Sequence, residues 1–156
     1  MNQLRRTFLK STGAAGTVAV AIAAGLLRPG QVLAAEWNTA AFNATTTEEA
    51  MKIVNVKGAV ESKDVQIKAP DIAENGAVVP VEITSKIPGV TSIMIFVDKN
   101  QNPLIADFTL SNGTEPYIST RIKMASTSHV RAVVKAGGKA YTASKEVKVT
   151  IGGCGG

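Results

Sequence analysis

The chain has 156 residues, of which 45% are hydrophobic, and it carries 17 lysines and arginines against 12 aspartates and glutamates. Four of the basic residues and none of the acidic ones lie at positions 1–34, so the remaining 122 residues carry only about +1, which argues against a nucleic-acid-binding surface. The single cysteine, Cys154, excludes an internal disulfide, so one domain of this length must be stabilised by packing alone.

Positions 1–34 have the three-part order of an export signal. A basic start containing Arg5 and Arg6 precedes an apolar stretch of small residues, and a small-residue cleavage pattern ends at Ala34. Residues 5–10 resemble the twin-arginine signal R-R-x-F-L-K, which implies bacterial export in a folded state. The stretch is too rich in glycine and alanine for a stable membrane-spanning helix. We therefore expect a signal peptide at 1–34, cleaved after Ala34 or Ala35, a periplasmic location and no stable membrane anchor.

A short helix is expected after a lead-in at 36–44. Three threonines and two glutamates at 45–49 place a glutamate three residues after a candidate N-cap, which is a capping-box pattern. The apolar residues Ala50, Met51 and Val54 then fall on one helical face. The sequence predicts a helix over about Thr47–Val54 that ends near Gly58.

From position 64 the apolar residues follow a period of two, which is typical of half-buried strands. Pro80 indicates either an edge strand or a strand that begins at Pro80. The unbroken apolar run Ser92–Val97 predicts a central strand that is buried on both faces. Some seven short strands are expected, at 64–68, 79–84, 92–97, 104–110, 118–122, 129–135 and 146–151, with the segment 140–144 following a hairpin-like connection at 136–139.

This spacing predicts an all-β fold, an immunoglobulin-like antiparallel β-sandwich with one short N-terminal helix packed on or beside it. We divide the chain into the signal peptide at 1–34, a helix plus β-sandwich carrier domain at 35–151 and a flexible C-terminal arm at 152–156.

The arm is the feature that carries chemistry. Cys154 stands between Gly152 and Gly153 on one side and Gly155 and Gly156 on the other, directly after the last predicted strand. Glycines give the backbone a wide conformational range and leave nothing to pack on the core. From Ile151 to Cys154 such a tether extends about 10 Å at roughly 3.3–3.6 Å per residue. The pattern predicts a thiol that covalently holds a substrate and delivers it into a narrow active site of another protein.

Other polar residues offer no second site. His129 is the sole histidine and stands beside Arg131 on a polar strand face, without the cluster of ligands that a metal needs. Asp98 and Asp107 lie in or after turns and form no acid–base pair. Lys145 and Lys148 precede the arm and are interpreted as a solvated strand face, or alternatively as groups that hold an anionic cargo or guide docking. No metal and no cofactor is predicted.

Three parts of the sequence resemble the SoxY family, the sulfur-carrier subunit of the bacterial thiosulfate-oxidising (Sox) system. They are the Gly-Gly-Cys-Gly-Gly ending, the segment Ala69–Val81 and the segment Ala143–Thr150, together with the twin-arginine leader. The resemblance covers essentially the whole chain after the signal, and the tail is its most specific part.

The resemblance implies a carrier that forms a heterodimer with SoxZ, a second β-sandwich subunit, and binds no metal or haem itself. It further implies three enzymes that act on Cys154: a c-type cytochrome complex (SoxAX) that couples thiosulfate to the thiol, a manganese-dependent hydrolase (SoxB) that releases sulfate, and a sulfur dehydrogenase. Sulfur would stay on Cys154 as thiosulfonate or persulfide.

Two other functions remain open on the residues alone. A small thiol enzyme, a sulfurtransferase or a peroxidase, would use Cys154 directly. A structural exported domain would use the same cysteine for a disulfide between two copies.

Overall fold

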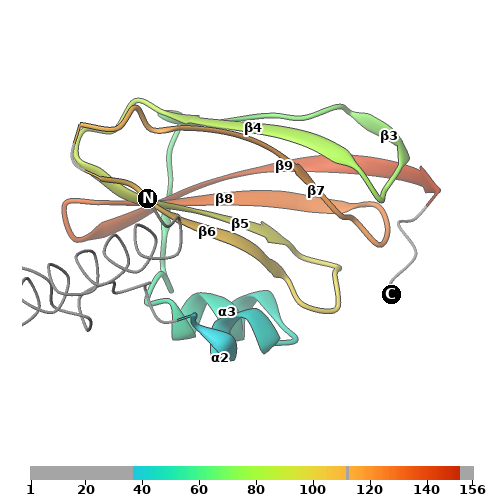
Figure 1. Cartoon of the computed structure of the whole chain (residues 1–156), viewed down its shortest axis with the longest axis horizontal. Helices are drawn as coiled ribbons and strands as arrows, with labels where there is room; N and C mark the ends of the chain where they lie inside the picture. The colour runs from blue at the N-terminus through green and yellow to red at the C-terminus, as the bar shows by residue number, and fades with distance from the viewer. Residues whose placement is uncertain (1–36, 112, 152–156) are drawn as a thin grey trace, which may run out of the picture. The chain divides into compact units, whose positions relative to one another are not determined.

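Two β-sheets packed face to face make up most of the structure (Figure 1). This computed structural model describes residues 37–111 and 113–151; the predicted signal, with Arg5 and Arg6, and the predicted arm, with Cys154, lie outside the described residues. The larger sheet has the strand order β1-β9-β8-β5-β6, with β3 also paired to β9, and the smaller sheet has the order β2-β4-β7. The prediction of an all-β sandwich is confirmed.

The strands have the following bounds: β1 Val60–Glu61, β2 Val65–Lys68, β3 Ile72–Asn75, β4 Val79–Ser85, β5 Val90–Val97, β6 Leu104–Thr109, β7 Tyr117–Ile122, β8 Ser128–Ala136 and β9 Lys139–Ile151. Neighbouring strands are antiparallel, as predicted, except that β1 and β3 both run parallel to β9.

The helix α3 (Thr47–Ile53) confirms the predicted helix, with Thr46 as its N-cap; the return bond from Glu49 goes to the residue before the cap. The Glu49 N–H donates to Thr46 Oγ1 at 3.2 Å, and the Thr45 N–H donates to the Glu49 carboxylate at 3.4 Å. A second helix, α2 (Thr39–Asn43), lies in the predicted lead-in. Its five residues are too few to show a helical period. Within the described ranges no helix is long and apolar enough to cross a membrane.

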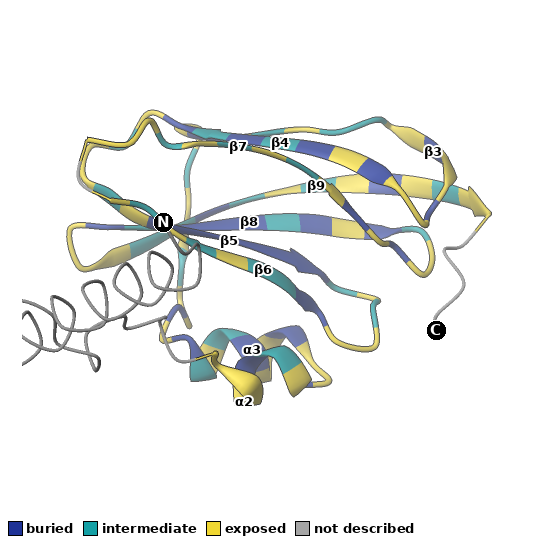
Figure 2. Ribbon diagram, in the orientation of Figure 1, coloured by how far each residue is buried: buried dark blue, intermediate teal, exposed yellow. Residues whose placement is uncertain are grey.

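Both faces of the larger sheet are covered, and β5 shows this best because it is buried along most of its length (Figure 2). Ile93, Ile95 and Val97 pack into the core between the two sheets. The alternate residues Met94 and Phe96 pack into a second cluster that includes α2 and α3. The run Ser92–Val97 is therefore unbroken because each face meets its own apolar layer.

Polar contacts hold α3 to the sheet at both ends. At its N-terminus Thr47 Oγ1 donates to Asp98 at 3.1 Å, and Arg131 in turn pairs with Asp98 at 3.2 Å. At its C-terminus the Lys135 ammonium donates to the Val54 carbonyl at 2.6 Å. A carboxylate at the first turn and a cation at the last both complement the helix dipole, so the helix is fixed in position as well as in orientation.

The structure decides or changes three points about the strands. Of the two alternatives for Pro80, the edge strand is wrong, because β4 is the middle strand of the smaller sheet, whereas a position at the beginning of the strand agrees with Pro80 as the second residue of β4. The proline is tolerated because pairing with β2 begins only at Glu82, so β2 does not flank β4 at Pro80. The segments 140–144 and 146–151 are one 13-residue strand, β9. The strands β1 and β3 were not predicted, because two and four residues are too few to show alternation.

Candidate functional site

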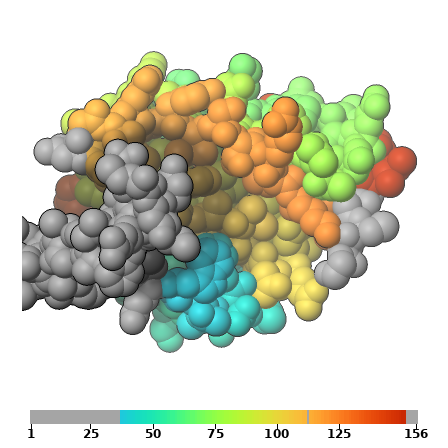
Figure 3. Space-filling view, in the orientation of Figure 1, coloured from blue at the N-terminus to red at the C-terminus, as the bar shows by residue number. Residues whose placement is uncertain are grey.

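Because Cys154 lies outside the described residues, the described part of the candidate site is the end of β9, from which the arm leaves. Figure 1 shows this end beside β3, away from the turn that joins β8 to β9. The last described residue, Ile151, is 69% exposed. In Figure 3 the red end of β9 stands at the surface beside the green atoms of the β3–β4 region.

On one side the end of β9 is held by β3. The two strands run parallel with Ile72 opposite Lys148, Ala73 opposite Val149 and Asn75 opposite Ile151. The Gly76 N–H donates to the Ile151 carbonyl at 2.8 Å, and Thr150 Oγ1 donates to the Glu74 carbonyl at 3.0 Å. The backbone of β9 is therefore paired up to its final described residue.

On the other side of β9, the side chain of Thr127 forms the hydrogen bond beyond the end of β8. The last β8–β9 pair is Ser128 opposite Val147, two residues short of Val149. The Val149 N–H donates instead to the hydroxyl of Thr127 at 2.9 Å, and the same hydroxyl lies 3.5 Å from the Val149 carbonyl. Thr127 thus extends the ladder of β9 beyond the end of its partner strand.

The two turns nearest this end brace β3 in place. The Met124 N–H donates to the Gly76 carbonyl at 2.7 Å. The side-chain amide of Asn100 then holds the Met124 segment from both directions: it donates to the Lys123 carbonyl at 2.7 Å and accepts from the Ala125 N–H at 2.9 Å. Hydrogen bonds therefore connect the β5–β6 turn, through the β7–β8 loop and Gly76, to Ile151.

The two lysines before the arm have different surroundings. Lys145 donates to the Ala69 carbonyl at 2.6 Å and pairs with Asp71 at 2.9 Å, with only 32% of its side chain exposed. The hydrogen bond from Lys145 and its positive charge lower the pKa of Asp71. Lys145 therefore anchors the segment before β3, whereas Lys148 is exposed. Neither a solvated strand face nor a group that holds cargo or guides docking accounts for these contacts of Lys145.

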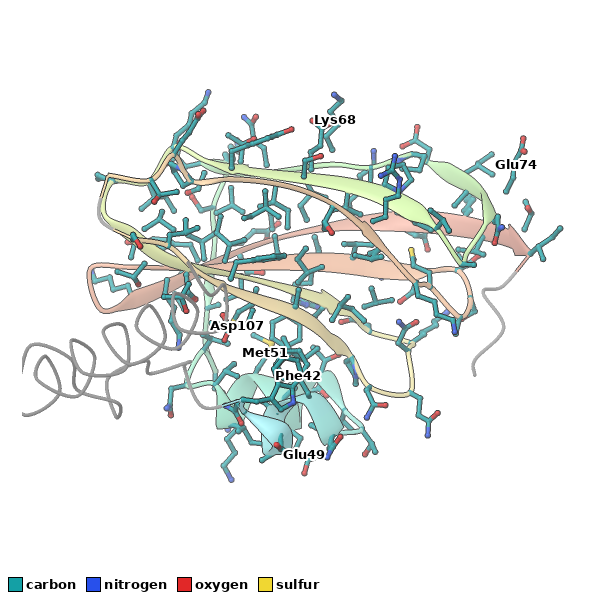
Figure 4. All side chains as sticks on the ribbon, viewed as in Figure 1. Phe42, Glu49, Met51, Lys68, Glu74 and Asp107 are labelled. Carbon is teal, nitrogen blue, oxygen red and sulfur yellow. The ribbon has the colours of Figure 1, made fainter. Side chains whose placement is uncertain are left out.

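The other predicted polar residues lie away from the arm. His129 is exposed and stands opposite Glu146, five residues before Ile151, which is about 17 Å along a strand. Asp98 is engaged by Thr47 and Arg131 at the helix. Asp107 lies on the helix side of the larger sheet, whereas Glu74 lies near the end of β9 (Figure 4). No group of three or more His, Cys, Asp or Glu residues that could hold a metal occurs within 37–111 and 113–151.

Three surface hollows also lie beyond the reach of the thiol. One is lined by Ala143 and Ser144, which precede Ile151 by seven residues or more, about 23 Å along β9. A second is lined by Lys139 and Ala140 at the start of β9, and the third includes Val90, which pairs with Ala136 at that same end of the sheet. Cys154 can extend only about 10 Å from Ile151.

Comparison with known proteins identifies a family and similar solved structures. Residues 50–154 match the family model described as "Sulfur oxidation protein SoxY". The structure of the sulfur carrier protein SoxY from Chlorobium limicola f thiosulfatophilum is 47% identical in sequence, with a TM-score of 0.56 over 63% of this chain and 91% of that chain. No curated protein matches the chain. The matched range includes the position of Cys154.

Proposed function

The chain belongs to the SoxY family and is a sulfur carrier of the Sox system. On that premise we propose that Cys154 is the attachment site, which holds thiosulfate-derived sulfur covalently and presents it to separate enzymes. Cys154 is the only thiol in the chain, so no other residue can form a disulfide-type bond to sulfur. The fully paired end of β9 supports this role because it gives the predicted arm a firm base at the surface.

Two reactions at Cys154 make up the proposed chemistry, an oxidative coupling and a hydrolysis. In the first, the Cys154 thiolate and the outer sulfur of thiosulfate join in an S–S bond as two electrons leave to an oxidant, which we assign to a c-type cytochrome complex. In the second, water attacks the sulfonate sulfur; sulfate and two protons leave, and a persulfide anion remains on Cys154. We assign this hydrolysis to a manganese-dependent partner enzyme. A sulfur dehydrogenase would then oxidise the sulfur that remains.

The distance from the end of β9 to the sole histidine and to the described hollows is the observation that supports the proposal of a non-catalytic carrier. A thiol enzyme needs a base within hydrogen-bonding distance of its nucleophile. The sole histidine is about 17 Å along the strand from the base of the arm, and the nearest of the three hollows described above is about 23 Å away, against a reach of about 10 Å. Catalysis is therefore assigned to the partners.

The short reach also limits how partners bind. An enzyme that acts on Cys154 must come within about 10 Å of Ile151, so it must cover the surface around the end of β9. Three of the large exposed apolar side chains belong to that region: Ile72, Val78 and Ile151. We propose a periplasmic carrier, exported by the twin-arginine pathway, that works as a heterodimer with a SoxZ-like β-sandwich subunit.

Intact-mass spectrometry of protein purified from cells growing on thiosulfate tests the attachment site. We expect discrete mass increases for thiosulfonate and sulfane sulfur on the C-terminal peptide, and none in a Cys154→Ser variant. A peroxidase would instead consume peroxide alone, and a structural dimer would show only a reducible double mass. Either of those patterns without sulfur adducts would overturn the proposal.

A further inference from the structure

We propose that Thr127 and Asn100 are positioning residues for the carrier: together with β3 they fix the point from which the arm extends, and so set how far Cys154 reaches. This inference rests on the proposed function, because it concerns the delivery of the sulfur held on Cys154. Hydrogen bonds on the two sides of β9 hold this base.

Thr127 is the first of these residues. The ladder between β8 and β9 ends at Val147, and without another donor or acceptor the β8 side of Val149 would be unpaired. The Thr127 hydroxyl accepts the Val149 N–H at 2.9 Å and so holds the strand two residues farther than β8 does by backbone pairing, measured from Val147 to Val149. The Thr127 hydroxyl therefore takes the place of a backbone carbonyl that a longer β8 would supply to Val149.

Asn100 acts from a distance. It has no hydrogen bond to β9, yet its side-chain amide fixes the segment 123–125 through two bonds of 2.7 and 2.9 Å. That segment holds the Gly76 carbonyl through Met124, and the Gly76 N–H holds Ile151. If the amide of Asn100 is lost, this side of the base is expected to loosen although every residue of β9 is unchanged.

A fixed base matters because the arm is short. Three Cα–Cα steps lead from Ile151 to Cys154, and fraying of Thr150 and Ile151 would lengthen the tether to five steps, counted from Val149. Effective concentration falls roughly as the −3/2 power of tether length, so such fraying lowers the local concentration of the thiol in a partner's active site by about twofold. A fixed base thus keeps the thiol near the channel it must enter.

Amide hydrogen exchange and electron–electron distance measurements test the proposal. The variants are Thr127→Val and Asn100→Ala; the controls are Thr127→Ser, which keeps the hydroxyl, and Asn102→Ala, an exposed residue of the same turn whose side chain has no hydrogen bond within the described residues. We expect exchange at Val149 and Ile151 to rise about fivefold in both variants, with the thermal unfolding midpoint of the body nearly unchanged. Both controls should match the parent chain.

Nitroxide labels on Cys154 and on a Ser144→Cys substitution report the reach directly. In Thr127→Val and Asn100→Ala the distance distribution should broaden and shift to shorter values, and coupling of thiosulfate by the partner cytochrome should slow by about twofold. Unchanged exchange and distances in both variants, or a broadened distribution with unchanged coupling, would overturn the proposal. Absence of sulfur adducts on the parent chain would instead overturn the proposed function and leave the exchange results standing.

Discussion

Lys145 is the residue whose contacts bear most directly on how the arm-bearing strand is held. Its ammonium joins β9 to the Ala69 carbonyl and the Asp71 carboxylate, immediately before β3 begins. The Lys148 N–H donates to the Asp71 carbonyl at 3.0 Å, so the same short segment is held by a side chain and by backbone. Lys145 therefore contributes to the pairing of β3 with β9, and so to the base of the arm.

Substitution of Lys145 by methionine should change the titration of Asp71. In the folded chain the pKa of Asp71 lies below the ordinary value of 3.8, so the pair contributes stability above that value and loses it as the pH falls through the folded-state pKa. In Lys145→Met the midpoint should rise toward 3.8, measured by NMR titration of the carboxyl carbon. A Lys148→Met control should leave the midpoint unchanged; an equal rise in the control would contradict the assignment.

Asp107 gives a pH effect of the opposite sign. Loss of hydration raises the pKa of its carboxyl, while the charge of Lys135 and the hydroxyl of Ser92 partly oppose the rise. The ionised form is thus disfavoured in the folded chain. Asp107→Asn should be as stable as the parent below about pH 3.8 and become more stable than it as the pH rises through the folded-state pKa. Urea denaturation at several pH values measures this; a difference that does not vary with pH would contradict it.

Among the elements, α3 shows how a short helix can be kept in place. Seven residues form few internal hydrogen bonds, so the helix depends on packing and on its ends. Asp98, in the turn after β5, and Lys135, in β8, supply charges of the favourable sign at the two ends of the helix. The capping box and apolar spacing predicted this helix, but the sheet residues that hold it are 51 and 81 positions away in the sequence.

Lys135→Met should destabilise the fold by about 1–3 kcal/mol, because the Val54 carbonyl at the helix end loses a charged donor at 2.6 Å. The midpoint of urea unfolding measures the loss. Lys139→Met, in the same hairpin and exposed, is the matched control and should change stability by less than about 0.5 kcal/mol. Equal losses in the two variants would argue against the helix-end contact as the cause.

At the scale of the whole molecule, the end of β9 lies far along the strand from the sole histidine and from the described hollows. The strand β9 spans the larger sheet, from the hairpin that lines one hollow to the end from which the arm leaves. A tether of about 10 Å cannot bring Cys154 back along this length. On the proposed function, partners must therefore approach the thiol from this end.

Deletion of Gly152 and Gly153 tests the importance of reach. The distance from Ile151 to the cysteine falls from about 10 Å to about 3.8 Å, so turnover of the sulfur adduct by a partner hydrolase should fall at least tenfold. Reaction with a small thiol reagent should change little, because such a reagent needs no tether. Deletion of Gly155 and Gly156 is the matched control and keeps the reach; an equal loss of turnover there would show that total glycine content, and not reach, is what matters.

The sequence by itself determined the features that depend on neighbouring residues. Alternation identified most strands, the capping box identified α3, and the unbroken run Ser92–Val97 identified a strand covered on both faces. The composition of the last five residues, with the resemblance it carries, was enough to predict a sulfur carrier. In each case a period or a short motif records the physical requirement, so no knowledge of distant contacts is needed.

Only the tertiary structure decided how the base of the arm is held. The partners of Lys145 and Thr150 are 76 positions away, and Asn100 reaches a loop 23 positions farther along the chain. Such contacts leave no period in the sequence, because one threonine or asparagine in a turn is compatible with many folds. The parallel strand β3 escaped prediction for the same reason: its four residues pair with β9 only after the chain has crossed between the two sheets.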